Sequence, residues 1–287
     1  MKDDSILARN LLLMGAAEEI FAEARKRGLR PALLKGAALL ALGVFRPDER
    51  EMSDIDLLAD PSEKKGLEKV LADLGFEAMP DSDQAWFRET GPAAPPVIAD
   101  IHTGLWHARA RASYFLKGAV PSADGLRALS PERLFAHLAC HPLLHHGEFG
   151  PKAAADLARL AEWASRKKSR ALFLKAVQPE CDRFGLRPAM TAALEATVRH
   201  LPGSFTPAEL AAFAPRGLGR LRARFFRRAA ERHSTALEYL LPVLHRPELL
   251  GLAFFPGSEF LKRRYGRSGL LTRLLRPFRI LRKIIGK

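Results

Sequence analysis

The first hundred residues alternate between helical and strand periodicity. Apolar side chains recur at helical spacing among charged residues in three segments, two of which end at a glycine, Gly28 or Gly75. The predicted helices are 5–27, 37–42 and 62–74. Short apolar or alternating runs between and after them fit strands. The predicted strands are 32–34, 52–58, 76–79, 84–89 and 97–102.

After Trp106 the strand signals vanish and helical patterns continue to the end. Ser130 is a suitable N-cap, and Pro131 suits the first turn of a helix. The predicted helices of this region are 131–144, 152–166, 171–184, 188–200, 218–240, 259–265 and 270–285. The sequence therefore predicts an α/β (α+β) fold. A small mixed-sheet domain with an N-terminal helix would occupy 1–124, and an all-helical region with a basic amphipathic tail would occupy 125–287.

Composition excludes several classes of protein. Hydrophobic residues make up 47% of the 287 residues and charged residues 27%, which excludes a disordered or fibrous chain. Two cysteines, Cys140 and Cys181, are too few for a disulfide scaffold or a four-cysteine zinc site. No secretory signal and no uncharged apolar stretch of membrane-spanning length are present in the sequence. We expect a cytoplasmic protein.

The net charge of +14 lies at one end of the chain. Residues 211–287, here called the basic tail, hold 18 Lys and Arg against 4 Asp and Glu, whereas residues 1–210 hold 28 of each sign. Apolar residues form a stripe near its end: Leu270, Leu271, Leu274, Leu275, Phe278, Leu281 and Ile285. Three interpretations stay open: docking on the protein's own helices, peripheral contact with an anionic membrane surface, or nucleic-acid binding.

Acidic residues on two predicted strands form the sharpest feature. In Ser53-Asp54-Ile55-Asp56, strand geometry would point Asp54 and Asp56 to the same face. Asp100 lies in the predicted strand 97–102. If the two strands are neighbours, three carboxylates converge, and such a cluster can hold two Mg²⁺ ions.

A second feature, a turn with a lysine and a glycine, lies before these acidic residues in the sequence. Lys35-Gly36-Ala37 joins a short strand to a helix, where glycine permits close backbone approach and lysine adds positive charge. This arrangement suits a triphosphate. His102 would share a face with Asp100, and contact with phosphate, orientation of a carboxylate and a structural role all stay open for it.

The order of these motifs resembles the DNA polymerase β-like nucleotidyltransferase superfamily. The amino-acid sequences of segments 33–39, 52–58 and 99–102 are similar to those of a largely uncharacterised bacterial branch described as nucleotidyltransferase family proteins. The resemblance implies that Asp54 and Asp56 are paired metal ligands and that Asp100 is the third carboxylate. It places Lys35, Gly36 and Ala37 at the nucleotide phosphates, with Ser53 and His102 beside them. Ala37 departs from the superfamily's Gly-Ser turn, which removes one hydroxyl contact to phosphate.

The implied function is Mg²⁺-dependent transfer of a nucleoside monophosphate from an NTP to an unknown acceptor hydroxyl, releasing pyrophosphate. The alternative is a non-catalytic accessory protein of the same fold, which docks on a membrane, RNA or a protein partner through the basic tail. The missing serine favours the alternative, and the three carboxylates favour the enzyme.

Histidines gather in one predicted helix. His137, His141 and His145 are spaced by four residues and His146 follows, a spacing that can bind zinc on an uninterrupted helix. Pro142 interrupts the segment, so the last pair need not share a face. Metal binding, packing and a role on the acceptor side stay open.

Overall fold

The computed structural model describes most of the chain up to residue 231. The described residues are 2–80, 82–91, 94–105, 108, 110–122, 124–231, 241, 245, 261 and 269. Trp106, the predicted helices 259–265 and 270–285, and most of the basic tail lie outside them. The chain folds into two compact units: unit 1 is 1–138 with 158–180, and unit 2 is 139–157 with 181–287. The boundary expected at residue 124 stays a prediction.

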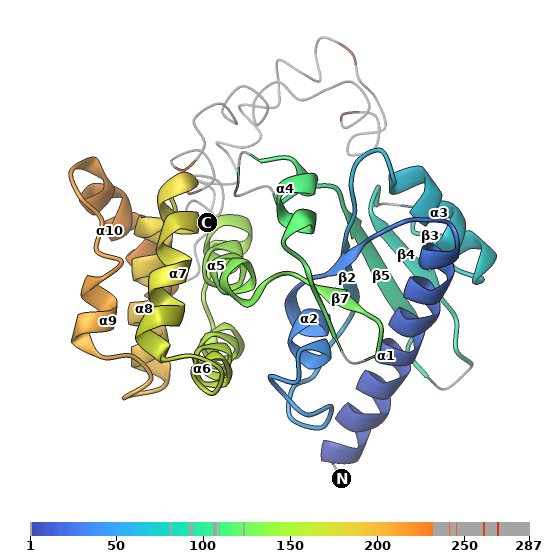
Figure 1. Cartoon of the computed structure of the whole chain (residues 1–287), viewed down its shortest axis with the longest axis horizontal. Coiled ribbons are helices and arrows are strands. Elements are labelled where there is room, and N and C mark those ends of the chain that lie inside the picture. Colours follow the sequence, from blue (N-terminus) through green and yellow to red (C-terminus); the bar gives the residue numbers. More distant parts are fainter. Residues whose placement is uncertain are drawn as a thin grey trace. The chain divides into compact units, whose positions relative to one another are not determined.

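A single mixed sheet forms the centre of unit 1. Among the described residues it has seven strands, in the order β3-β4-β5-β2-β1-β7-β6 (Figure 1). The strands are β1 (Ala32–Leu33), β2 (Ile55–Leu58), β3 (Glu77–Ala78), β4 (Ala85–Arg88), β5 (Val97–His102), β6 (Val120–Pro121) and β7 (Arg127–Ala128). The pairs β2–β5 and β1–β7 are parallel, and the other pairs are antiparallel.

The register of β2 and β5 gives the sheet two different faces. Ile55 pairs with Ala99, and Asp56 pairs with Asp100. Ile55 and Ala99 are fully buried, and the helix α1 packs across both strands. Side chains on neighbouring positions of a strand point to opposite faces. Asp56 and Asp100 therefore lie together on the other face.

Helices surround this sheet and make up unit 2. Their bounds are α1 (Lys2–Lys26), α2 (Lys35–Ala41), α3 (Lys64–Asp73), α4 (Ala112–Lys117), α5 (Pro131–His141), the π-helix η1 (Pro142–His146), α6 (Pro151–Ser165), α7 (Arg170–Arg183), α8 (Arg187–His200), α9 (Pro207–Ala211) and α10 (Leu218–Glu231). α1 ends where Gly28 adopts a φ of 71°, which glycine tolerates best. In unit 2, α8 packs against α10, α9 and η1.

The predicted α/β fold with a helical C-terminal region is confirmed, and three local expectations need correction. Strand structure continues after residue 106, because β6 and β7 pair as a short hairpin. Strands of two residues show no periodicity that a sequence can reveal. The α-helix expected over 131–144 ends at His141 and continues as η1. α4 and α9 were not predicted either.

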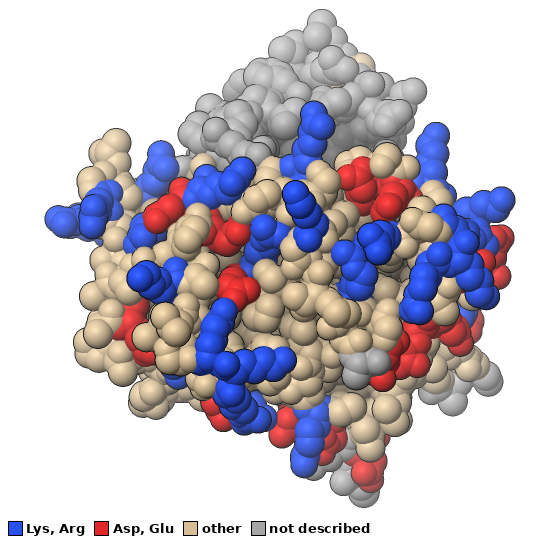
Figure 2. Space-filling model, in the orientation of Figure 1, with Lys and Arg blue, Asp and Glu red and all other residues tan. Residues whose placement is uncertain are grey.

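The surface carries both signs of charge. Figure 2 shows one face of the molecule, on which Lys and Arg side chains lie beside Asp and Glu side chains. On α10, Arg220, Arg222 and Arg224 are exposed, and Leu218 and Leu221 are 78% and 52% exposed. Within the described part of the chain, no helix has both the length and the apolar character needed to cross a membrane.

Candidate functional site

Asp56 lies at the centre of the candidate site and is almost completely buried. Its strand lies between β1 and β5, and its side chain is only 3% exposed. Nζ of Lys35 lies 2.7 Å from Oδ1 of Asp56, and Nε2 of His102 lies 2.8 Å from the same oxygen. Burial disfavours the carboxylate, but the hydrogen bond from His102 and the charge of Lys35 outweigh burial and hold the pKa of Asp56 below its ordinary value. Asp56 is therefore an anion in the folded protein at neutral pH.

Asp100 lies beside Asp56 in a less favourable environment. The two residues are register partners on β2 and β5. Oδ1 of Asp100 is buried and has no hydrogen-bond partner among the described residues. Burial raises the pKa of Asp100, and the negative charges of Asp56 and Asp54 raise it further. An orphaned carboxylate oxygen next to a second carboxylate calls for a cation or a proton.

Asp54 lies just before β2 rather than within it. It accepts a hydrogen bond of 2.9 Å from Oγ of Ser53. Ligand atoms of Asp56, Asp100 and His102 lie within 4.8 Å of one another, and these three residues are here called the carboxylate cluster; Asp54 is outside it. The structure therefore brings Lys35, Asp56, Asp100 and His102 together. It places Asp54 near enough to influence the pKa of Asp100, but not in the same cluster.

Arg9 and Asn10 of α1 hold the segment that carries Asp54. Arg9 donates to the carbonyl oxygens of Ser53, Pro95 and Pro96 at 3.0, 2.9 and 2.8 Å. It thus joins the approach to β2 to the approach to β5. These contacts cross 44 to 87 residues of sequence, and no local pattern indicates them. The supporting roles of Arg9 and Asn10 were therefore not predicted from the sequence.

Asn10 is fully buried and makes three hydrogen bonds to the loop before β2. Its Nδ2 donates to the carbonyl oxygens of Pro47 and Arg50 at 2.6 and 2.7 Å, and its Oδ1 accepts from the backbone of Met52 at 3.1 Å. A buried asparagine in an amphipathic helix is the one signal that could have identified this contact from the sequence.

The Lys35-Gly36 turn places the ammonium of Lys35 at Asp56 and lies against the guanidinium of Arg50. Lys35 has a φ of 44°, in the left-handed region that is unusual for residues other than glycine. Such strain persists where the surrounding structure imposes it, commonly at functional sites. At Gly36 a Cβ atom would overlap the guanidinium of Arg50 and lie 3.1 Å from Cγ of Met52. The guanidinium of Arg50 thus approaches Gly36 closely, and the phosphate contact expected at Gly36 stays a prediction. Ala37 is buried at 1% exposure.

The residues present suit a hard divalent cation. Carboxylate oxygens are the ligands that Mg²⁺ prefers, and two carboxylates with an orphaned oxygen form such a donor set. Asp56 and Asp100 would hold the ion, and the neighbouring Nε2 of His102 would orient Asp56.

One of three comparisons with known proteins shows the family of the chain. A crystal structure of ANT(2")-Ia in complex with adenylyl-2"-tobramycin is similar to it at a TM-score of 0.40 and 19% identity, over 57% of this chain and 97% of that chain. A comparison with curated proteins gave no match. A family model described as an uncharacterised nucleotidyltransferase matches residues 4–202, which is more than half of the chain and includes every residue of the carboxylate cluster. The chain therefore belongs to this family of uncharacterised nucleotidyltransferases.

Proposed function

We propose that the protein is a Mg²⁺-dependent nucleotidyltransferase that moves a nucleoside monophosphate from an NTP to an acceptor hydroxyl and releases pyrophosphate. Family membership supports the reaction class. The observation that carries the assignment to a site is the register pairing of Asp56 with Asp100, together with the buried Oδ1 of Asp100, which has no hydrogen-bond partner in the described part of the chain.

In this proposal Asp54, Asp56 and Asp100 hold the metal. Asp56 is the permanent anion, because Lys35 and His102 keep its pKa low. Asp54 completes the set from the segment that Arg9 and Asn10 hold in place. When bound, Mg²⁺ neutralises the charge of the triphosphate and orients it toward the acceptor.

Lys35, Gly36 and Ala37 would bind the phosphates, with Ser53 and His102 at the edge of the same site. The ammonium of Lys35 lies at the carboxylate cluster, so it would interact with both Asp56 and the phosphates. The guanidinium of Arg50 packs on Gly36. It brings a second cation to the turn, in place of the serine hydroxyl that Ala37 lacks.

Asp100 would accept the proton of the acceptor hydroxyl. As that oxygen bonds to the α-phosphorus, the bond from the α-phosphorus to the pyrophosphate oxygen breaks, and the hydroxyl proton passes to Asp100. A carboxylate that holds the metal with one oxygen keeps a second oxygen that can accept this proton.

A labelled-transfer experiment tests this function for an acceptor of any chemical class. The full chain is incubated with each α-labelled NTP, Mg²⁺ and separated protein, RNA and small-molecule fractions of a cell extract. We expect label in one fraction and release of pyrophosphate. We expect Asp100→Asn to lower the rate by about 10²–10⁴-fold, while Asp73→Asn, an exposed aspartate on α3, leaves the rate unchanged. Transfer by Asp100→Asn at the wild-type rate would contradict the proposal.

Besides the missing serine, one structural observation favours the accessory-protein alternative. α10 exposes Arg220, Arg222 and Arg224 next to the exposed Leu218 and Leu221. Cations beside apolar side chains suit an anionic surface. This role does not need nucleotide binding, which separates it from the enzyme.

A further inference from the structure

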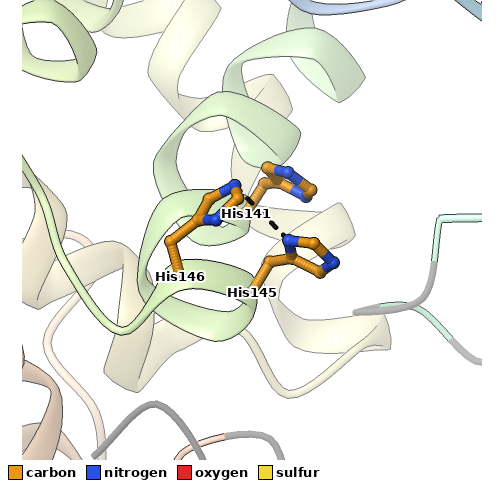
Figure 3. Close-up of side chains that lie close together, drawn as sticks. All are labelled: His141, His145 and His146. Carbon is orange, nitrogen blue, oxygen red and sulfur yellow. Dashed lines mark hydrogen bonds between the residues drawn. The ribbon is translucent and has the colours of Figure 1, made fainter. Parts of the chain in front are cut away.

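Three histidines of unit 2 lie together around the π-helix η1. His141 is the last residue of α5, and His145 and His146 are the last two residues of η1. Figure 3 shows the three rings gathered beside one turn of the helix. Ring nitrogens of all three lie within 4.8 Å of one another.

The π-helical turn is what brings His146 into this group. In a regular α-helix a residue four positions away shares a face, but a residue five positions away is rotated off it. Bonding from residue i to residue i+5 widens the turn, so both positions face the starting residue. The rings of His141 and His145 stack with centroids 4.9 Å apart, and His146 lies edge-on to His141 at 5.3 Å. From the sequence, Pro142 interrupts the segment, so that His141 and His145 need not share a face. In the structure their rings stack in spite of Pro142.

The backbone around the cluster is fixed by packing on its inner side. Leu143 and Leu144 of η1 are fully buried, and η1 contacts α8 and α10. Gly147 ends the turn with a φ of 65°, and its N–H donates to the carbonyl oxygen of Pro142. A ligand at the histidines would therefore order few additional backbone groups, which keeps the entropic cost of binding low.

The separation of the ring nitrogens matches a metal ligand pair. Nδ1 of His145 and Nε2 of His146 share a hydrogen bond of 3.3 Å, so one of these nitrogens carries a proton that must leave that position when a metal binds. Zinc binds histidine nitrogen at about 2.0–2.1 Å, which places two nitrogens of one tetrahedral ion about 3.4 Å apart. One pair thus has the required spacing already, and small ring rotations would bring the third nitrogen to it.

We propose that His141, His145 and His146 form a binding site for a divalent transition-metal ion such as Zn²⁺, separate from the carboxylate cluster of unit 1. Imidazole nitrogen suits Zn²⁺, Cu²⁺ and Ni²⁺, whereas Mg²⁺ prefers oxygen ligands. His145 and His146 are exposed, and His141 is buried. Solvent would therefore complete the coordination sphere, as in zinc sites with three protein ligands.

Calorimetric titration of the full chain, made without a histidine tag and stripped with chelator, tests the site. Zn²⁺ is titrated in the presence of excess Mg²⁺, which competes for the carboxylate cluster, and the titration is repeated on Asp56→Asn to identify any Zn²⁺ bound there. We expect one Zn²⁺ per chain with a dissociation constant in the micromolar range or below, and a rise in Tm. The double variant His145→Gln/His146→Gln should weaken binding at least 100-fold. His200→Gln, an exposed histidine at the end of α8, should bind as the wild type does.

Two results of the titration would overturn the site: no Zn²⁺ binding by the wild type, or wild-type affinity in the double variant. His145 and His146 are exposed, so their substitution should leave folding intact, and circular dichroism checks this. The buried thiols Cys140 and Cys181 also belong to unit 2, so Co²⁺ loading adds a test of ligand type. In the absorption spectrum of the Co²⁺-loaded chain we expect ligand-field bands alone. Strong charge-transfer bands from thiolate to Co²⁺ would place the ion on cysteine and contradict the proposal.

Discussion

At Asp56 a buried carboxylate depends on its two neighbours for stability. The side chain of Lys35 is 26% exposed and that of Asp56 is 3% exposed, so their ion pair is only partly screened by water. Breaking a fully buried pair costs about 3–5 kcal/mol, and partial exposure lowers that figure. In the absence of metal, Lys35 therefore supplies positive charge that stabilises the carboxylate of Asp56.

We predict that Lys35→Met lowers the free energy of unfolding by about 1–3 kcal/mol in the absence of metal, and that Mg²⁺ restores part of this loss. The pKa of Asp56 is lowered in the folded state, so the stabilisation is present above the ordinary aspartate pKa and is lost as pH falls through the folded value. Denaturant unfolding with and without Mg²⁺ measures the effect. Equal stability of the two proteins at neutral pH without metal would show that Lys35 does not stabilise Asp56.

Asp100 should behave in the opposite way. Its pKa is raised in the folded state, so its ionisation opposes folding, and this penalty grows as pH rises through the folded pKa. Asp100→Asn should therefore raise Tm at neutral pH by about 2–4 °C, which corresponds to about 1 kcal/mol. The difference should shrink on acidification. A lower Tm for Asp100→Asn at neutral pH, measured by calorimetry without metal, would refute this assignment.

Among the elements, α1 supports the site from a distance. Asn10 joins the helix to the loop before β2 through three hydrogen bonds, and Arg9 joins the same region to the start of β5. This helix thus does more than cover the buried face of the sheet.

Replacing Asn10 by alanine should remove its hydrogen bonds to the part-buried carbonyl oxygens of Pro47 and Arg50 and to the buried N–H of Met52. We predict a loss of about 2–4 kcal/mol in unfolding free energy and weaker Mg²⁺-dependent nucleotide binding. Leu11→Ala, at a 55% exposed position of the same helix, is the control and should change stability by less than about 0.5 kcal/mol. Urea titration of both variants distinguishes them, and equal midpoints would exclude a supporting role for Asn10.

Elements with several periodic residues could be predicted, and very short ones could not. β5 alternates in burial over its length, whereas all four residues of β2 are buried. Their parallel pairing makes Asp56 and Asp100 neighbours, the condition under which the carboxylates were expected to converge. β6 and β7 have two residues each and form through tertiary pairing. The π-helix η1 was not predicted either, because α-helical spacing along the sequence does not distinguish a π-helical turn from an α-helical one.

Side-chain partners in the candidate site were less predictable than its strands. The sequence indicated Lys35 as a phosphate ligand, but its contact with Asp56 depends on a φ of 44° at that residue. Arg50 on Gly36 likewise depends on how the loop returns to the turn. Such contacts are determined by the assembled fold and not by spacing along the chain.

At the scale of the whole molecule, the uneven charge suggests binding to an anionic surface. The described part of the basic tail exposes arginines on α10. We predict that the full chain sediments with phosphatidylserine vesicles at low salt and dissociates at high salt. Arg220→Gln/Arg222→Gln/Arg224→Gln should weaken binding, by about 1 kcal/mol per arginine. Neutral vesicles are the control, and binding that does not depend on salt or on these arginines would contradict this prediction.

The most direct test of the central claim is a thermal-unfolding panel of four NTPs, each with and without Mg²⁺. A ligand at 100 times its dissociation constant stabilises the folded state by about 2.7 kcal/mol. With a shift of about 2–4 °C per kcal/mol, this raises Tm by about 5–10 °C. We predict a Mg²⁺-dependent rise with at least one NTP in the wild type and in Asp73→Asn, and its loss in Asp54→Asn/Asp56→Asn. No rise with any NTP at millimolar concentration, or an equal rise in the double variant, would contradict nucleotide binding at the carboxylate cluster.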